Sequence, residues 1–200
     1  MNGEPVALGG PRDVRGILDG PVDAEACVVA CPPHPEYGGN RHDQRLVAVS
    51  EALAAAEIAG LRFDYGPWDG GPGEREDDGR AVRRAADRYS PVGLFGYSFG
   101  GGIALLEAAT EPVAAVSVLA PAARLGPDLD AVAALEMLPP SIPVQVQYGT
   151  RDDRVSWEPV VVAARERGAE CVEYAADHFF LTREADIGDA VAEFMAAHLG

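Results

Sequence analysis

Short apolar runs alternate along the chain with longer segments in which apolar residues recur every three or four positions. The short runs are rich in β-branched and aliphatic residues, and they predict strands at 26–30, 61–65, 92–95, 113–119, 142–148 and 170–174. The longer segments predict helices with one buried face at 41–59, 76–88, 102–109, 157–167 and 185–199. Gly60 is the predicted stop of the first helix. A turn at 9–12 between apolar segments predicts a β-hairpin at 5–18.

Strands that alternate with helices of this length form βαβ units, so the pattern predicts an α/β fold. We expect a mostly parallel sheet of about eight strands with helices on both faces, and the opening hairpin as its antiparallel edge. The sequence contains no repeat and no dividing linker, so residues 1–200 are expected to form one domain. A loop rich in Gly, Pro and acidic residues is predicted at 66–79. The connection at 121–140 is short, with one helical patch at 131–137, and predicts little or no lid.

The charged residues are strongly unbalanced. All 16 basic residues are Arg, against 32 Asp and Glu, which gives a formal net charge of −16. Such a field repels nucleic acids and anionic membranes, and we exclude both as partners. A GC-rich genome favours Arg over Lys but does not by itself double the acidic count, whereas a salty cytoplasm selects an acidic, hydrated surface. We therefore favour a halophilic origin, and we expect the acidic field to favour neutral or cationic substrates.

The sequence gives no sign of a membrane protein, an exported protein or a metalloprotein. No apolar run approaches the ~20 residues that span a bilayer, and the first residues lack the features of a secretory signal, so we expect a cytoplasmic location. Cys27, Cys31 and Cys171 are an odd number without CxxC spacing. Cys27 and Cys31 lie too far apart on one strand to bond, so free thiols are expected. We find no HxxxH pair or nucleotide-type Gly-rich loop, and we expect neither a metal nor a cofactor.

The motif that carries most chemistry is a GxSxG pattern at 96–100, between a predicted strand and a predicted helix. A strand-to-helix turn this tight gives the serine a strained backbone and needs flanking glycines, because a Cβ would clash with the neighbouring elements. The strain exposes the serine oxygen and points the next N–H, that of Phe99, at a developing oxyanion. Ligands bind at the carboxyl ends of strands in such sheets, where this motif lies. Ser98 is therefore the predicted nucleophile.

A serine hydroxyl needs a base, and the chain has only four histidines. His198 lies in the last turn of the final predicted helix and His42 at the start of an earlier one, so both are expected at the surface. His178 follows the last predicted strand directly and is the predicted base. The alternative for His178 is a purely structural role, packed against Phe179.

The imidazole of a catalytic histidine needs an acid that holds its tautomer. Asp152 and Asp153 follow the predicted strand 142–148, and their side chains cannot both face the site. Asp152 is the predicted acid and Asp153 its rival. Asp177 is a weaker rival, because a neighbour in sequence rarely reaches the Nδ1 of its own histidine. The resulting chain order of Ser, Asp and His is the order of α/β hydrolases.

A second oxyanion donor is expected in the segment that follows the strand at 26–30. The prolines of that segment have no N–H, which leaves His34 and Glu36 as candidates, and we favour His34. The side chains of Tyr37 and Tyr97 are predicted to contact the substrate. A structural role is the alternative for these tyrosines, and the sequence leaves the same two roles open for Tyr65 and Trp68.

Five segments of the chain resemble the small dienelactone-hydrolase-like branch of the α/β hydrolases. They lie at 34–39, 61–65, 96–101, 148–152 and 177–180, in the same order along nearly the whole chain. The resemblance implies an α/β-hydrolase fold and a compact serine hydrolase without a lid. Two features depart from it: the relatives usually carry HPHP at 32–35, where this chain has PPHP, and true dienelactone hydrolases use a Cys nucleophile, where this chain has Ser98. The second departure favours simple ester chemistry over dienelactone.

These observations predict a serine hydrolase that acts on carboxylic esters or related small acyl compounds through an acyl-enzyme intermediate. A thioesterase, peptidase or acyltransferase would use the same triad. A non-catalytic binding or scaffold protein is the alternative from another class, since a fold does not fix a function. The sequence leaves the acyl length and the oligomeric state open.

Overall fold

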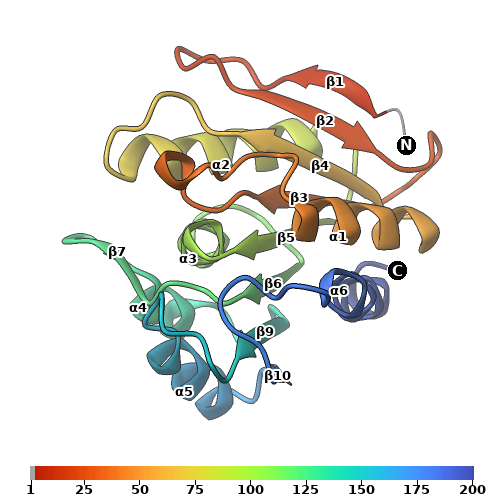
Figure 1. Cartoon of the computed structure of the whole chain (residues 1–200). Helices are drawn as coiled ribbons and strands as arrows, with labels where there is room; N and C mark the ends of the chain where they lie inside the picture. Colours follow the sequence, from red (N-terminus) through yellow and green to blue (C-terminus); the bar gives the residue numbers. More distant parts are fainter. Residues whose placement is uncertain (1–2) are drawn as a thin grey trace.

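The apolar segments of the chain pair into one eight-stranded sheet, which a computed structural model describes together with all other residues from 3 to 200. The strand order is β1-β2-β4-β3-β5-β6-β9-β10 (Figure 1). The strands are β1 (Glu4–Ala7), β2 (Arg15–Asp19), β3 (Cys27–Cys31), β4 (Ala59–Asp64), β5 (Val92–Tyr97), β6 (Ala115–Leu119), β9 (Val144–Gly149) and β10 (Glu170–Tyr174). From β4 to β10 all neighbours are parallel, whereas β1 and β2 form the antiparallel edge. The predicted α/β architecture and its opening hairpin are confirmed.

Helices cover both faces of the sheet, as Figure 1 shows. One face carries α1 (Gln44–Ala55) and α6 (Glu184–Leu199), which pack against each other. The other face carries α2 (Pro72–Ala86), α3 (Phe99–Ala108), α4 (Ala131–Met137) and α5 (Glu158–Glu166). A short 3₁₀ helix, η1 (Pro35–Tyr37), follows β3. A second, two-stranded sheet of β7 (Arg124–Gly126) and β8 (Leu129–Asp130) lies between β6 and α4.

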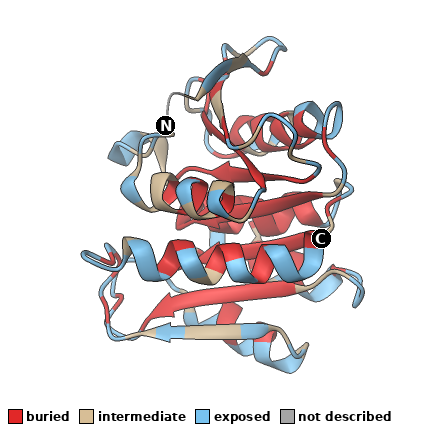
Figure 2. Cartoon of the chain, turned by 90° about the vertical axis from the view of Figure 1, so that its right-hand side faces the viewer, coloured by how far each residue is buried: buried red, intermediate tan, exposed pale blue. Residues whose placement is uncertain are grey.

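The core forms two layers, one on each side of the sheet. The central strands are buried along their whole length, and the helices are buried on the side that faces them (Figure 2). In β5 the side chains alternate between the layers: Leu94 packs with Ile103 on one side, and Phe95 packs with Leu46 and Ile187 on the other. Each of these side chains is fully buried and contributes about 1.5–3 kcal/mol through the hydrophobic effect. The central strands, including the ends that precede the site, are thus packed on both faces.

Several helix boundaries differ from the prediction; α3, for example, starts at Phe99 instead of 102. The helix expected at 41–59 ends at Ala55, and Gly60 lies inside β4 instead of stopping the helix. A Cβ at Gly60 would lie 2.7 Å from the Ser50 hydroxyl of α1, so glycine is needed there for close packing of strand and helix. The helix expected to start at 76 starts at Pro72, because the Glu74 carboxylate accepts a hydrogen bond from the Gly71 N–H over 2.8 Å. The acidic loop at 66–79 therefore contains the first turns of α2.

The region between β6 and β9 contains the β7–β8 hairpin and α4, and the hairpin was not predicted. Its strands have only three and two residues, too short for an alternating pattern. The predicted free thiols are confirmed: all three cysteines are unbonded. Burial raises the pKa of Cys27 to about 12, so this thiol is protonated at neutral pH.

Candidate active site

Ser98 occupies the turn between β5 and α3. Its backbone has φ 57° and ψ −116°, a conformation that non-glycine residues rarely adopt. Its N–H donates to the Leu119 carbonyl of the neighbouring strand β6 over 2.9 Å, and its own carbonyl accepts from Gly102 N–H over 3.1 Å. These bonds hold the strained turn in a single conformation, with the serine side chain at the carboxyl end of the sheet.

The flanking glycines of the motif are required by space. A Cβ at Gly100 would lie 2.3 Å from the carbonyl oxygen of Pro32 and 2.4 Å from that of Cys31. A Cβ at Gly96 would lie 2.3 Å from the carbonyl oxygen of Gly100. All of these neighbours are backbone atoms and cannot move aside cheaply. The glycines thus allow α3 to start directly against β3 and β5.

His178 and Asp152 lie next to Ser98 in one hydrogen-bonded line. The distance from His178 Nε2 to Ser98 Oγ is 3.0 Å, and the distance from His178 Nδ1 to Asp152 Oδ2 is 2.6 Å. A carboxylate can only accept, so Nδ1 carries the proton and Nε2 is free to accept from the serine hydroxyl. All three residues are at most 8% exposed. This arrangement can take a proton from Ser98 and stabilise the resulting imidazolium.

Asp152 is the only one of the three candidate acids that reaches His178. Its Oδ1 accepts from the Arg154 N–H at 2.9 Å, which orients Oδ2 toward the imidazole. The side chain of Asp153 is 90% exposed and faces Arg154. The side chain of Asp177 accepts from the Phe179 N–H at 3.0 Å. The two rivals considered from the sequence are therefore engaged elsewhere.

The other histidines lie outside this line. The ring of His198 packs on Phe194 of α6, with 4.7 Å between the ring centroids. His42 lies just before α1, where its backbone N–H donates to the Asn40 side chain. His34 lies after β3, and its Nδ1 accepts from the Glu36 N–H at 3.3 Å.

Phe99 and His34, which are the residues of the two expected oxyanion donors, both line the pocket around Ser98. Phe99 is the first residue of α3, so its N–H has no acceptor within the helix. Of the two candidates after β3, Glu36 uses its N–H within the η1 turn. In the described part of the chain, 3–200, the His34 N–H has no acceptor. Of the two candidates, His34 is therefore the one whose N–H is not used by another group in residues 3–200.

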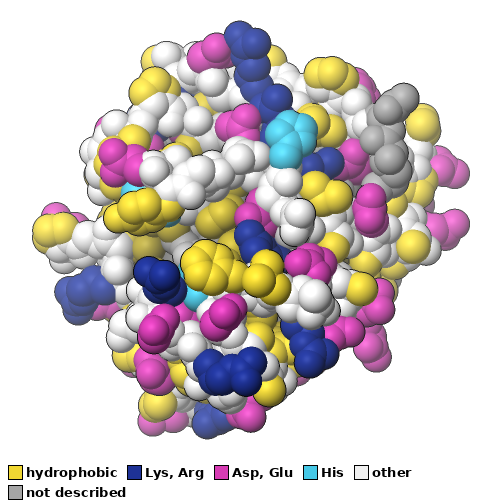
Figure 3. Space-filling view, in the orientation of Figure 1, with side chains coloured by type: hydrophobic (Ala, Val, Ile, Leu, Met, Phe, Trp, Pro, Cys, Tyr) yellow, Lys and Arg dark blue, Asp and Glu magenta, His cyan; other side chains and the backbone are white. Residues whose placement is uncertain are grey.

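A pocket of about 780 Å³ opens above Ser98 and His178. Figure 3 shows this face of the molecule, where hydrophobic side chains gather around a hollow. Tyr37 and Tyr97 both line the pocket. Tyr37 is 88% exposed, whereas Tyr97 is buried. Burial raises the pKa of Tyr97 above its usual value, so its hydroxyl stays protonated. That hydroxyl donates to the His178 carbonyl at 2.8 Å, so Tyr97 offers only its ring to the pocket.

The charged side chains that line the pocket are mostly basic, although the chain as a whole is strongly acidic. They are Arg45, Arg124, Arg154 and Asp43. Asp43 is paired with Arg45, and Arg124 is paired with Asp130 at 2.6 Å. The expected preference for cationic substrates therefore has no support in the pocket lining.

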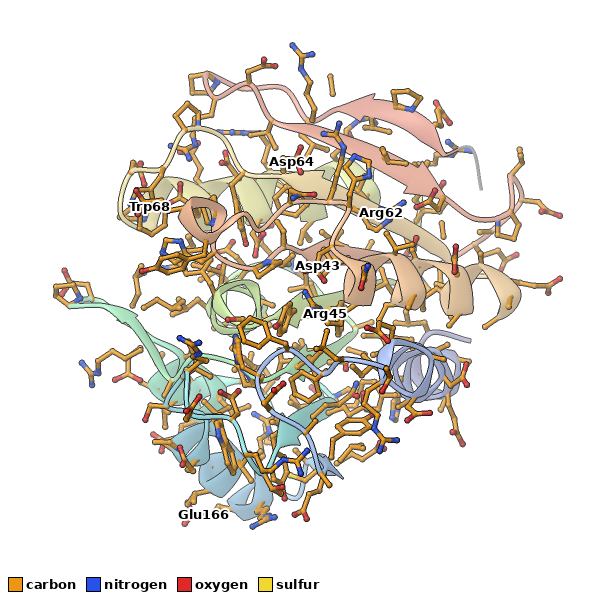
Figure 4. All side chains as sticks on the ribbon, viewed as in Figure 1. Asp43, Arg45, Arg62, Asp64, Trp68 and Glu166 are labelled. Atoms are coloured by element: carbon orange, nitrogen blue, oxygen red, sulfur yellow. The ribbon has the colours of Figure 1, made fainter. Side chains whose placement is uncertain are left out.

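Arg45 lines the pocket and was not identified from the sequence, whereas Trp68, whose role the sequence left open, is now placed in the pocket lining. Figure 4 shows Trp68 at the left of the view, beside η1, and Arg45 near the centre, below Asp43. Trp68 comes from the β4–α2 loop and Arg45 from the first turn of α1. An Arg at a helix start carries no sequence pattern that indicates a pocket, and a lone Trp in a loop does not show whether it contacts a ligand. Only the fold brings them to Ser98.

Within residues 3–200, no group of three or more His, Cys, Asp and Glu side chains has the arrangement of a metal site. No helix in the same range combines the length and apolar character needed to cross a membrane.

Solved structures of α/β hydrolases match nearly the whole chain. An α/β serine hydrolase homologue from Coxiella burnetii matches with a TM-score of 0.82 at 23% identity and covers 98% of both chains. A serine hydrolase without a lid from Xanthomonas campestris matches with a TM-score of 0.79 at 22% identity, over 98% of this chain and 95% of the other. A dienelactone hydrolase from Anabaena variabilis matches over 100% of both chains, with a TM-score of 0.74 at 22% identity. No protein-family model and no curated protein matches the chain.

Similarity at these identities shows the fold. The chain has the α/β-hydrolase fold, as predicted, and among its structural neighbours are serine hydrolase homologues, one of them without a lid, and a dienelactone hydrolase. The resemblance to dienelactone-hydrolase-like proteins thus extends from five short segments to the whole architecture.

Proposed function

We propose that the protein is a serine hydrolase that cleaves small carboxylic esters through an acyl-enzyme intermediate. The observation that carries the proposal is the line of hydrogen bonds from Ser98 through His178 to Asp152, with distances of 3.0 and 2.6 Å. The strained backbone of Ser98 adds support, because such strain persists at positions that need a particular side-chain direction. The structural similarity to serine hydrolases and esterases is consistent with this chemistry.

In the proposed reaction, Ser98 Oγ attacks the ester carbonyl carbon while its proton passes to His178 Nε2. The carbonyl oxygen becomes an oxyanion, which accepts hydrogen bonds from the backbone N–H groups of Phe99 and His34. The intermediate collapses when His178 gives its proton to the leaving alkoxide, and the acyl group stays on Ser98. Water, deprotonated by His178, then attacks the acyl-serine; the bond from the acyl carbon to Ser98 Oγ breaks, His178 returns the proton to Oγ, and the carboxylic acid is released. Asp152 stabilises the imidazolium in both halves.

Esters are the substrate class we favour because a Ser nucleophile favours simple ester chemistry, and small acyl groups are favoured because residues 3–200 form no lid domain over the pocket. Only the β7–β8 hairpin and the seven-residue helix α4 separate β6 from β9. Such a connection leaves small acyl groups accessible and offers no cover for a long lipid chain. The substrate is a small molecule, and the mechanism uses only side chains and backbone groups of this chain.

The test is hydrolysis of p-nitrophenyl acetate and butyrate, in low salt and in molar salt, by wild-type protein and by Ser98→Ala. We expect the substitution to lower kcat by about 10⁴-fold or more. Ser141→Ala removes an exposed hydroxyl away from the pocket and should keep full activity. A fluorophosphonate probe should modify one serine in the wild type and none in Ser98→Ala.

Activity that persists in folded Ser98→Ala would contradict the proposal. Absence of hydrolysis and of probe labelling in the wild type would favour the scaffold alternative. Cleavage of thioesters or peptides with no cleavage of esters would keep the nucleophile and change the substrate class.

A further inference from the structure

The two ends of the pocket lie on opposite sides of Ser98. Ser98 follows β5 at the centre of the sheet, and the strand order places β3 and β4 on one side of it and β6, β9 and β10 on the other. His34 and Trp68 line the pocket from the loops after β3 and β4. Arg154 and His178 line it from the loops after β9 and β10. The side that holds the catalytic base is therefore distinct from the side that holds Trp68.

Four aromatic rings form a continuous surface on the β3–β4 side of the pocket, and we call this surface the aromatic wall. Its members are His34, Tyr37, Trp68 and Phe99. The His34 ring lies at the centre, with centroid distances of 4.4 Å to Trp68, 4.8 Å to Tyr37 and 4.9 Å to Phe99. Trp68 and Phe99 also contact each other, at 5.5 Å. The rings are tilted by 42–67° to one another, so the wall presents both ring faces and ring edges.

The part of the wall formed by Phe99 is supported from behind. Tyr65, which is buried, packs edge-on against Phe99 at 5.8 Å. Leu125 of β7 closes the pocket beside the wall and packs against α3, where a Cβ at Gly102 would lie 2.8 Å from the Leu125 side chain. Burial lowers the pKa of His34, so its imidazole is neutral at pH 7 and acts as an aromatic surface. An uncharged aromatic surface is suited to flat apolar groups.

The chemistry of the proposed reaction assigns the two sides to the two parts of an ester. His178 must hand a proton to the leaving alcohol, so the alcohol part lies on the side of His178. The acyl part then extends from Ser98 in the other direction, toward the β3–β4 side. Phe99 belongs both to the wall and to the expected oxyanion site, so the carbonyl and the wall are adjacent.

We propose that the aromatic wall is the acyl subsite and that it selects esters of planar aromatic carboxylic acids. The inference rests on the proposed function and deepens it by naming the substrate class. A benzoyl-type ring can stack on or meet the edges of His34 and Trp68, and such aromatic pairs gain free energy beyond the burial of apolar area. A saturated ring of the same size gains the burial but not the aromatic contact.

The test compares three esters with one leaving group: p-nitrophenyl benzoate, p-nitrophenyl cyclohexanecarboxylate and p-nitrophenyl acetate. Each kcat/KM is divided by the rate constant of alkaline hydrolysis of the same ester, which removes the intrinsic difference in reactivity. We expect the corrected kcat/KM for benzoate to exceed that for cyclohexanecarboxylate by about three- to tenfold. A ratio of one or less would overturn the inference.

Substitutions at Trp68 connect the preference to the wall. Trp68→Leu keeps an apolar side chain and removes the aromatic one, and it should lower the benzoate-to-acetate ratio of kcat/KM by about three- to tenfold. Trp68→Phe should restore most of the ratio, which excludes a general loss of structure. Phe194→Leu makes the same kind of change in α6, away from the pocket, and should leave the ratio unchanged.

The outcomes separate the inference from the proposed function. If the acetate is cleaved and Ser98→Ala abolishes that cleavage, but the ratio does not respond to Trp68→Leu, the acyl subsite is elsewhere and the serine hydrolase stands. A preference for cyclohexanecarboxylate would indicate an apolar site without aromatic selection and would also overturn the inference. If none of the three esters is cleaved, both the ester-hydrolase proposal and the inference fail.

Discussion

The phenolic hydroxyl of Tyr97 donates a hydrogen bond to the backbone carbonyl of His178, with 2.8 Å between the two oxygens. The guanidinium of Arg45 lies over the Tyr97 ring, 4.6 Å from its centroid, and donates to the carbonyl of Phe179 at 2.8 Å. Two neighbouring carbonyls of the histidine loop are thus held by side chains from β5 and α1. Since Tyr97 directly precedes Ser98, this contact connects the nucleophile's turn to the base. We infer that Tyr97 is a positioning residue for His178.

Replacing Tyr97 with Phe should lower kcat about tenfold and leave KM within twofold. The ring that lines the pocket remains, but His178 loses the contact that fixes its backbone, and small displacements of a base are costly. Steady-state kinetics on p-nitrophenyl butyrate measures the two constants separately. Tyr174→Phe is the matched control, because it also removes a tyrosine hydrogen bond, to Gln147 at 2.8 Å, without touching the pocket. A rise in KM at constant kcat would assign Tyr97 to substrate binding instead.

The close approach of α3 to β3 predicts a strong effect of Gly100→Ala. The added methyl group would lie 2.3 Å from the Pro32 carbonyl oxygen, so the turn must shift. We expect a loss of about 1–3 kcal/mol in the free energy of unfolding and a large loss of esterase activity, because Ser98 moves with the turn. Gly126→Ala is the control, since its nearest neighbour would lie at an ordinary 3.8 Å. Urea unfolding and ester hydrolysis on both variants check the prediction, and equal behaviour of the two would refute it.

Asp152 is buried and its neighbour Asp153 is exposed, so substituting each of them separately tests which one is the acid of the triad. Asp152→Asn should lower kcat by about 10³–10⁴-fold, because an amide at Oδ2 no longer holds the Nδ1–H tautomer of His178. Asp153→Asn removes an exposed carboxylate and should stay within twofold of the wild type. Both variants keep the volume of the side chain, so folding is a minor concern. A larger effect of Asp153→Asn than of Asp152→Asn on kcat would reverse the assignment of the acid.

The elements of the site with a local signature could be predicted from the sequence. Ser98 stands in a strand–turn–helix segment whose glycines are dictated by contacts within a few residues and with the next strand. His178 and Asp152 each follow a strand directly, so the rule that sites lie at the carboxyl ends of strands brings them together. Their assembly around Ser98 needed only the order of the strands.

The parts that could not be predicted depend on long-range contacts. Arg45 reaches the histidine loop from a position 134 residues earlier in the chain, and no spacing in the sequence encodes this. Trp68 meets His34 across two loops whose relative position is set by the pairing of β3 with β4. The start of α2 was misplaced because Gly, Pro and acidic residues also form loops, and only the bond from Gly71 to Glu74 makes them a helix start.

A buried carboxyl group in α2 has no role in the proposed reaction and leads to a prediction about stability. Within residues 3–200, neither oxygen of Asp78 has a partner in good hydrogen-bond geometry, although the side chain is fully buried. Its neighbours Asp77 and Glu74 each pair with Arg12, at 2.9 and 2.8 Å. Burial raises the pKa of Asp78 well above its usual value, because the Cys31 thiol and the Tyr65 hydroxyl offset the loss of water only in part.

The groups that face Asp78 offset its burial only in part. They are the Cys31 thiol of β3, the Tyr65 hydroxyl after β4, the Glu107 carboxyl of α3 and the adjacent Asp77. Two of them are neutral polar groups and two are acids, so ionised Asp78 would meet no cation. The native state therefore keeps Asp78 protonated at pH values where the unfolded chain has lost that proton.

This difference fixes the sign of the pH dependence. Below the unfolded pKa of about 3.9, Asp78 is protonated in both states and costs nothing. As the pH rises above that value, the unfolded state releases the proton and the native state does not, so stability falls by up to about 1.4 kcal/mol per pH unit until the native pKa is reached. Asp78→Asn removes this effect. The variant should thus gain stability over the wild type as the pH rises from 4 to 8.

Urea unfolding of both proteins at pH 4, 6 and 8 measures the gain directly. Asp189→Asn, which removes an exposed carboxyl group from α6, corrects for the change in net charge and should show no comparable gain. A constant difference between Asp78→Asn and wild type across this range would mean that Asp78 binds the same number of protons in both states. A wild type that becomes the more stable protein at pH 8 would mean that native Asp78 is ionised and stabilised by its surroundings.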